Sequence, residues 1–566
     1  MPPVPTGDLP VLDLDEIPYT VAYSRLFVRA DGDALTVYRA AYERSLTDSV
    51  VLGSLRLRDE AGAVVPVLGA TPLGIEFRDG TSLVVTPEDT VHVGTLPPGT
   101  RLEMDLGLPP LEAALTTERL VLPGDAARSA VDGLTRVETP TGGDVLIACA
   151  GALPAAVRHE EAVSTTSASV LSWLARCPVV EDQWQPLVRL CWWVLGVNTL
   201  ELGGAALGRA VVPSKLGYVG LWQWDAYFIA IGLRHGDPEL AAEQLRIALS
   251  HPQPSGQLPD VVHEDGVLAS SDDLPPGDLE TLRAMASPSL AHSRIPLTKP
   301  PLTALAVQLV SEQHGGGLVD EFIEAILASQ DWWYAESDPR GTGEPAYLHP
   351  YSSGLDDSPI FDHDAMVASP DLAAYLILQD RILVGWLLER DRGDEAARCQ
   401  DRADGALAAL VARWEPDRGF FPSLGDAGAA LSTDAVVGLI PLLADGLPDV
   451  LADALLAATT DPLRYGTPHR LPTVAADDPA FSPTRMWRGP VWVNINWLVA
   501  RGMRQQGFDD AADALERETL AMAALSGGPH EYFNPMDASK PPRATTCFGW
   551  SSALVVDMAV RLSSAG

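Results

Sequence analysis

One stretch indicates the fold class of this 566-residue chain: Ser369-Pro-Asp-Leu-Ala-Ala-Tyr-Leu-Ile-Leu-Gln-Asp-Arg-Ile-Leu-Val-Gly-Trp-Leu-Leu388. Ser369 is a typical N-cap residue, and Pro370 fills the first helical position, where proline is favoured. Apolar residues then recur at helical spacing, at Leu372, Tyr375, Leu376, Leu383, Trp386 and Leu387. The pattern predicts a helix over residues 371–391.

The same period continues on both sides of this stretch, from about residue 180 onward. Asp237-Pro-Glu239 begins a second helix in the same way. We expect twelve helices, near residues 183–198, 225–235, 238–250, 300–314, 318–334, 371–391, 394–414, 434–444, 448–459, 490–506, 508–525 and 550–563. Helices joined alternately by short turns and long loops suggest six hairpins, which would close into an (α/α)6 barrel. An open solenoid is the alternative, but the sequence shows no repeat of fixed period.

The first 172 residues differ from the rest because they contain none of the fourteen tryptophans. They consist of short segments rich in Val, Leu and Tyr, separated by turn signals such as Asp31-Gly-Asp33. Strands are expected at residues 35–38, 50–52, 54–58, 74–77, 82–85 and 145–147. Such closely spaced strands indicate an antiparallel β-sandwich. We therefore predict a multidomain α+β chain with a β-sandwich accessory domain at 1–160, a linker helix at 161–180 and an (α/α)6-barrel catalytic domain at 181–566.

The loops of the helical part are unusually long. Five of them exceed the usual connection length, at residues 199–224, 251–299, 335–369, 460–489 and 526–549. Unstructured loops of this length in a compact domain are usually functional. We expect them to gather at one end of the barrel and to line a pocket.

Composition excludes several classes of protein. The formal net charge of −37 disfavours binding to a phosphate backbone, so nucleic acid is not expected as a partner. No apolar run is long enough to span a membrane, and the first residues do not resemble a signal peptide. The five cysteines fit neither a disulfide framework nor a metal site, which favours the cytoplasm. We expect no metal and no organic cofactor, and homo-oligomers remain open.

A first aromatic cluster follows Tyr218. The run Leu221-Trp-Gln-Trp-Asp-Ala-Tyr-Phe228 contains Trp222, Trp224 and Asp225. Sugars have apolar C–H faces and hydroxyl rims, so aromatic faces beside a carboxylate suit them. A buried aromatic stripe on the next helix is the structural alternative.

A second aromatic cluster, Met486-Trp-Arg-Gly-Pro-Val-Trp492, leads into a predicted helix. Trp487 and Trp492 would lie where the loop meets that helix. Arg488 could form bidentate contacts there.

Carboxylates occur on two further loops. Asp356 stands next to Asp357 in a Gly/Ser/Pro-rich loop, and Glu531 follows His530 on another. Either one alone is weak evidence, since an Asp pair usually caps a turn. Hydrolysis of a glycosidic bond, however, needs one carboxylic acid to protonate the leaving oxygen and a second carboxylate on the opposite face. Asp356 and Glu531 would meet across the barrel.

Together these motifs resemble glycoside hydrolase family 63. The series Pro-Ser-Lys, Trp-Gln-Trp-Asp, Ser-Gly-Leu-Asp, Trp-Arg-Gly-Pro-Val-Trp and His-Glu-Tyr is most similar to the mannosylglycerate and glucosylglycerate hydrolases of that family. The resemblance covers residues 180–566. It implies an inverting α-glycosidase with Asp356 as general acid and Glu531 as general base. It also implies that Tyr218, Trp222, Trp224, Asp225, Trp487 and Trp492 shape the sugar pocket, and Arg488 is added to the binding set.

Two positions depart from the family pattern. Asp357 stands where Asn is common; its charge would raise the pKa of Asp356, or the residue caps a turn. Lys299 stands where Gln is common, and it is one of only three lysines in the chain, with Lys215 and Lys540. We expect at least one of these lysines to contact an anionic aglycone such as a glycerate carboxylate.

These observations predict an exo-acting hydrolase of a small α-glucoside or α-mannoside, such as glucosylglycerate. An α-glucoside phosphorylase and a sugar-binding protein on the same barrel are the alternatives. A phosphorylase would need no general base, so Glu531 argues against it, and both carboxylates argue against a mere binding protein.

Overall fold

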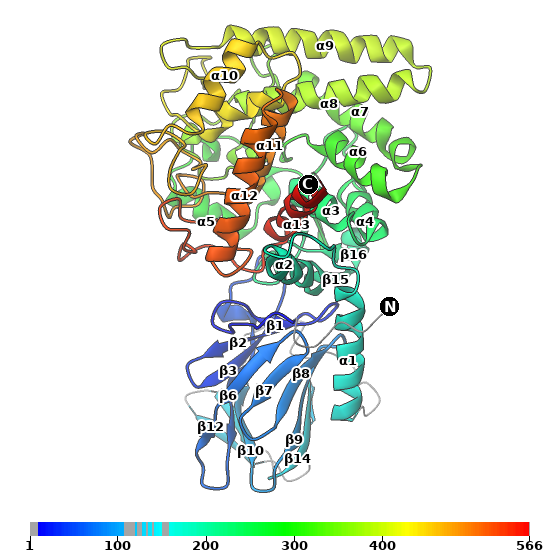
Figure 1. Cartoon of the computed structure of the whole chain (residues 1–566), viewed down its shortest axis with the longest axis vertical. Helices are drawn as coiled ribbons and strands as arrows, with labels where there is room; N and C mark the ends of the chain where they lie inside the picture. The colour runs from blue at the N-terminus through cyan, green and yellow to red at the C-terminus, as the bar shows by residue number, and fades with distance from the viewer. Residues whose placement is uncertain are drawn as a thin grey trace. The chain divides into compact units, whose positions relative to one another are not determined.

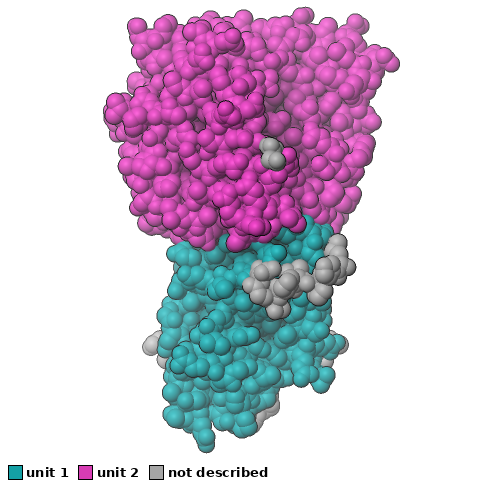
Figure 2. Space-filling view, viewed as in Figure 1, with its two compact units in different colours: residues 1–177, 188–201, 210–219 teal, residues 178–187, 202–209, 220–566 magenta. Residues whose placement is uncertain are grey.

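The computed structural model describes residues 9–106, 119–121, 127–131, 134–138, 141–149 and 158–564. The chain divides into two compact units (Figure 2). Unit 1 comprises residues 1–177, 188–201 and 210–219, and unit 2 comprises residues 178–187, 202–209 and 220–566. Antiparallel sheets precede a helical part, so the chain is a multidomain α+β protein (Figure 1).

Unit 1 contains two large antiparallel sheets within the described ranges. The first has the order β1-β2-β3-β4-β10-β13-β12, with β5 also paired to β4. Its strands are β1 (Tyr19–Thr20), β2 (Leu26–Asp31), β3 (Ala34–Arg39), β4 (Val50–Arg58), β5 (Val64–Val65), β10 (Arg101–Leu106), β12 (Ala127–Val131) and β13 (Leu134–Glu138). The second has the order β11-β14-β9-β8-β7-β6. Its strands are β6 (Val67–Thr71), β7 (Gly74–Phe77), β8 (Ser82–Thr86), β9 (Thr90–Leu96), β11 (Arg119–Val121) and β14 (Gly143–Ala148).

One strand is longer than the sequence predicts. Residues 50–52 and 54–58, expected as two strands, form the single strand β4. Its pairing with β10 jumps from Arg56–Glu103 to Gly53–Asp105, and Ser54 lies in the left-handed region at φ +51°. This is a β-bulge, in which an extra residue bends a strand without ending it. Gly53, which lies between the two predicted strands, is part of that bulge.

Two buried histidines lie where the second sheet contacts helix α1 (His159–Leu174), and one of them bonds the sheet to the helix. On β9, the ring of His92 hydrogen-bonds the Thr90 hydroxyl at 3.0 Å, and the ring of His159 hydrogen-bonds the Ser82 hydroxyl at 2.7 Å. Both residues are buried. Burial lowers the pKa of His92 to about 4 and holds the pKa of His159 below its usual range.

This arrangement predicts that unit 1 loses stability in mild acid. In the unfolded chain His92 takes up a proton near pH 6.5, whereas in the fold it stays neutral down to about pH 4. The stability is complete above pH 6.5 and decreases below it, by at most about 1.4 kcal/mol per pH unit for this residue. Hydrogen exchange of the β8 and β9 amides between pH 7 and pH 5 should show this after correction for intrinsic rates. His92→Gln should flatten the dependence, and the exposed His363→Gln should not; equal slopes in all three proteins would refute the assignment.

The chemistry-bearing loops of unit 2 connect α-helices. These helices are α3 (Gln223–Leu233), α4 (Pro238–Ala248), α5 (Pro276–Ala284), α6 (Thr303–His314), α7 (Leu318–Glu336), α8 (Pro370–Leu388), α9 (Gly393–Ala412), α10 (Asp449–Ala458), α11 (Val493–Gln505), α12 (Asp509–Leu525) and α13 (Gly549–Ser564). Helix α2 (Gln185–Val197) is shared between the units. Consecutive helices pack in pairs, as α3 with α4, α6 with α7, α8 with α9 and α11 with α12. Within the described ranges, no helix has both the length and the apolar character needed to span a bilayer.

Each of the twelve predicted segments contains a helix, with two differences from expectation. Residues 436–443 form a 3₁₀ helix, because Pro441 inside it cannot donate an α-helical hydrogen bond. Helix α5 falls in the predicted loop 251–299 and was missed. It begins at a Pro-Pro pair and buries only Leu282, so it lacks an apolar stripe.

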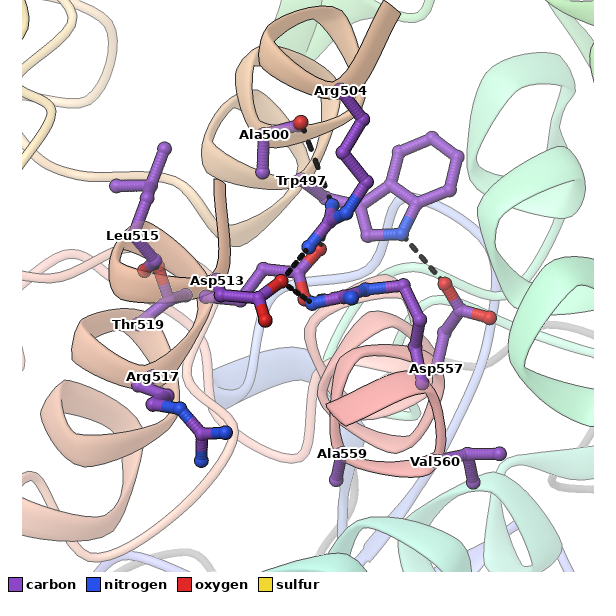
Figure 3. A network of polar contacts seen from close by, with 12 residues as sticks. Trp497, Ala500, Arg504, Asp513, Leu515, Arg517, Thr519, Asp557, Ala559 and Val560 are labelled. Carbon is purple, nitrogen blue, oxygen red and sulfur yellow. Dashed lines mark hydrogen bonds and ion pairs between the residues drawn. The ribbon is translucent and has the colours of Figure 1, made fainter. Parts of the chain in front are cut away.

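Buried and partly buried charges between α11, α12 and α13 are paired (Figure 3). Arg504 donates to Glu516 at 2.6 Å and to Asp513 at 2.9 Å, and Arg561 lies 3.0 Å from the same Asp513 carboxylate. The indole N–H of Trp497 donates to Asp557 at 2.7 Å. A charge in a protein interior is tolerated when it is paired in this way, so the network holds the three helices in register.

Candidate active site

The loop that carries Asp356 is held by a close contact with an aromatic ring. A short 3₁₀ helix, η6 (Pro350–Ser353), ends at Gly354, which has φ +71°. A Cβ at residue 354 would lie 2.2 Å from a ring carbon of Trp224. Only glycine fits both the left-handed backbone and this approach. Asp356 therefore follows a turn whose position is fixed against α3.

The Asp356 carboxyl suits a proton donor. Its Oδ1 atom is buried and has no hydrogen-bond partner among the described residues. Burial raises the pKa of Asp356 to about 8, with smaller increases from Asp260, Asp278 and Asp357 and an opposing effect of Lys299. A carboxyl with this pKa carries a proton at neutral pH, as a general acid must.

Asp225 lies within electrostatic range of both Asp356 and Glu531. Asp225 is in the first turn of α3, where burial raises its pKa; Lys299 opposes the shift, and Asp260, Glu531 and Asp356 add to it. Glu531 is 3% exposed and accepts a hydrogen bond from the main-chain N–H of Thr545 at 2.9 Å. The structure thus brings together carboxylates that lie far apart in the sequence.

Two of the three lysines, Lys215 and Lys299, are buried, and they form contacts in different parts of the structure. Lys299 is 5% exposed; its ammonium lies 2.9 Å from Asp260 and donates to the carbonyl of Tyr351 at 2.6 Å. Lys215 lies in unit 1, where it donates to Thr20 and to the carbonyl of Val21. Lys215 is therefore engaged in holding β1.

Asp357 links the loop that carries Asp356 (residues 350–358, called the acid loop below) to the second aromatic segment. Its carboxylate accepts hydrogen bonds from the main-chain N–H of Trp487 at 2.8 Å and from Arg485 at 3.0 Å. Arg488, predicted to bind substrate, forms a bidentate ion pair with Asp362. Of the two possibilities raised for Asp357, the increase in the pKa of Asp356 is present, whereas its carboxylate bonds the distant segment 485–487 rather than serving as the expected turn cap.

The predicted aromatic platforms pack on one another. Trp487 and Trp492 stack with ring centroids 3.6 Å apart, and Trp224 meets Trp550 edge to face at 5.4 Å. Trp224, Trp487 and Trp492 are at most 2% exposed. These rings form the kind of buried aromatic cluster that was the structural alternative for the first motif. Trp222 is partly exposed, whereas Tyr218 belongs to unit 1.

The sequence analysis missed three residues near the candidate acid: Asp260 and Asp278, whose charges act on Asp356, and Trp550, which packs on Trp224. The rarity of lysine drew attention to Lys299, but nothing in the sequence indicates which carboxylate it binds. Asp278 lies on the missed helix α5. In the described part of the chain, no group of His, Cys, Asp and Glu is arranged to hold a metal ion.

Comparison with known families defines the class of enzyme. The sequence model described as the mannosylglycerate hydrolase MGH1-like glycoside hydrolase domain matches residues 218–551. This match covers more than half of the chain, and the chain is a glycoside hydrolase. It belongs to the MGH1-like family of glycoside hydrolases, which confirms the resemblance to family 63.

Two curated relatives have closely related activities. The mannosylglycerate hydrolase of Thermus thermophilus is 30% identical over 413 residues, which cover 62% of this chain and 96% of the relative. The glucosylglycerate hydrolase of Mycolicibacterium hassiacum is 27% identical over 435 residues, covering 63% and 95%.

Solved structures similar to this chain include another mannosylglycerate hydrolase and a glucoamylase. A family 63 mannosylglycerate hydrolase from Thermus thermophilus, in complex with Tris and D-glycerate, has a TM-score of 0.55 at 26% identity and covers 66% of this chain and 99% of its own. A bacterial glucoamylase complexed with acarbose has a TM-score of 0.60 and covers 97% of this chain and 94% of its own. At 10% identity, the second likeness concerns the fold alone.

Proposed function

We propose that this enzyme is an exo-acting, inverting α-glycosidase that hydrolyses a small α-glucoside or α-mannoside, with glycerate conjugates as the first substrates to test. The observation that carries the proposal is the Asp356 carboxyl, whose raised pKa and buried, unpartnered Oδ1 atom suit a proton donor, together with Asp225, on which both Asp356 and Glu531 act. The two curated relatives named above support the choice of substrate.

In the proposed reaction, Asp356 gives its proton to the glycosidic oxygen as the bond from that oxygen to the anomeric carbon breaks. A water molecule held by Glu531 attacks the same carbon from the opposite face, and Glu531 takes the water's proton. The product is a β-configured sugar from an α-linked substrate. Inversion needs the two carboxyls roughly 6.5–9.5 Å apart, so that the water fits.

The substrate-binding set proposed from the sequence is Tyr218, Trp222, Trp224, Asp225, Lys299, Trp487, Arg488 and Trp492. Within unit 2, the partly exposed Trp222 is the aromatic member best able to meet a sugar face. Trp224, Trp487 and Trp492 would act mainly by shaping the wall behind it. We further propose that the helices close into an (α/α)6 barrel and that the two sheets form a sandwich.

The raised pKa of Asp356 predicts the pH dependence of the reaction. The acid is protonated, and active, below its pKa of about 8 and loses its proton above it. The value of kcat/KM should therefore decrease about tenfold per pH unit above this point. Initial rates between pH 6 and pH 10 test this; a rate that already decreases above pH 5 would contradict the role of Asp356.

The decisive experiment for the activity is a substrate panel. Purified protein is incubated with mannosylglycerate, glucosylglycerate, trehalose, kojibiose and nigerose, and the released sugar is measured with and without phosphate. We expect free sugar from at least one α-linked substrate, independent of phosphate. Formation of a sugar phosphate would indicate a phosphorylase instead. A cytoplasmic location remains a prediction.

A further inference from the structure

A buried ion pair lies behind the acid loop, formed by Lys299 and Asp260. The side chains of Lys299 and Asp260 are 6% and 2% exposed, and they lie 2.9 Å apart. The two segments come from opposite ends of the long loop 251–299. Taking two charges out of water is expensive, and such a pair persists where further hydrogen bonds support it. The further bond of Lys299 goes to the acid loop itself.

Two hydrogen bonds fasten the segment of Lys299 to the turn before Asp356. The ammonium donates to the carbonyl of Tyr351 at 2.6 Å, and the main-chain N–H of Thr298 donates to the hydroxyl of Ser352 at 3.3 Å. The hydroxyl of Tyr351 in turn donates to the carbonyl of Asp278 at 3.4 Å. Tyr351 is thus held at both its main chain and its side chain, just before the turn that leads to the acid.

The charges around Asp356 come from several segments of the chain. Asp225 lies on α3, Asp260 precedes β18 (Val261–His263), Asp278 lies on α5 and Asp357 follows the acid directly. Among the described residues whose charges shift the pKa of Asp356 most, Lys299 is the positively charged one. Its charge lowers the pKa of Asp356, whereas Asp278 raises it.

We propose that Lys299 is a positioning residue for the general acid, which it holds through the main chain of Tyr351 while presenting the balancing positive charge. This inference rests on the proposed function, because it assumes that Asp356 is the acid. It differs from the sequence-based expectation that Lys299 contacts an anionic aglycone. The ammonium of Lys299 is already engaged by Asp260 and Tyr351.

The test is the pH profile of kcat/KM, measured with one neutral α-glycoside and one glycerate conjugate. The quantity compared is its alkaline limb, the pH range in which kcat/KM decreases as Asp356 loses its proton. Lys299→Gln should move that limb upward by about one pH unit, equally for both substrates, and should lower kcat. Lys299→Arg, which keeps the charge, should restore the limb toward its original position. Asp278→Asn should move it downward, because a neighbouring negative charge is lost. Arg543→Gln is the control, since it removes an exposed cation near the loop of Glu531 and should leave the limb in place.

Other outcomes have distinct meanings. A loss confined to the glycerate conjugate, with no shift of the limb, would show an aglycone contact and overturn the proposal. Lower activity with an unmoved limb on both substrates would show a merely structural role and also overturn it. If Lys299→Gln does not fold, Asp260→Asn/Lys299→Gln leaves no unpaired charge and should show a smaller upward shift, because the loss of Asp260 also removes a charge that raises the pKa of Asp356. Should the wild-type enzyme cleave neither substrate, or Asp356→Asn remain fully active, the proposed function itself fails.

Discussion

Asp356→Asn and Glu531→Gln should each lower kcat by a factor of about 10²–10⁴ while the fold stays intact. Each change keeps the shape of the side chain and removes one half of the proton chemistry. Asparagine cannot protonate the leaving oxygen, and glutamine cannot accept the proton of the attacking water. The measurement is release of sugar under saturating substrate, with circular dichroism and a melting curve to show that the variants are folded.

Asp357→Asn is the matched control for this prediction. It alters a carboxylate next to the acid, and the amide oxygen can still accept the hydrogen bond from Trp487 that the structure shows. Its effect on kcat should be far smaller. Proton NMR of the first released sugar should show the β anomer. Early appearance of the α anomer, or an Asp357→Asn loss as large as that of Asp356→Asn, would refute the assignment.

Trp487→Ala should lower the free energy of unfolding by about 3–5 kcal/mol, the usual cost of removing a large buried aromatic side chain. Trp487 is 1% exposed and stacks on Trp492 at 3.6 Å, with Trp224 and Trp550 within 6.5 Å between ring centroids. The change would leave a cavity. This cavity would lie beside the acid loop, since the main-chain N–H of Trp487 donates to Asp357. Chemical denaturation of both proteins measures the effect.

Trp222→Ala separates packing from sugar binding. Trp222 is partly exposed, so its removal should cost much less stability than the removal of Trp487. If it meets the substrate as proposed, KM should increase instead. Equal destabilisation by the two changes would show that Trp222 belongs to the same packed cluster, and unchanged KM would remove it from the binding set.

Local sequence determined the helices and strands of this protein and pointed to the residues proposed to carry its chemistry. Helical period and caps placed the helices, as at α4, where Asp237 accepts a hydrogen bond from the N–H of Leu240. At α8, Pro370 begins the helix as predicted, although the Ser369 hydroxyl bonds Asp371 instead of a main-chain N–H. These features depend on neighbours within one turn, which a single sequence contains. Asp356, Glu531 and the tryptophan motifs were found because their residue types suit sugar chemistry.

Only the tertiary structure decided what those residues touch. The partner of Lys299 is Asp260, the partner of Arg488 is Asp362, and the faces of Trp487 and Trp492 cover each other. The two ion pairs join residues that are far apart in the chain, and the stack depends on how one segment folds on itself. A local sequence pattern predicts neither kind of contact. Helix α5 was missed for a different reason, because it has almost no apolar stripe of its own. The pKa of Asp356 is likewise a property of the fold, since burial and charges from other segments set it.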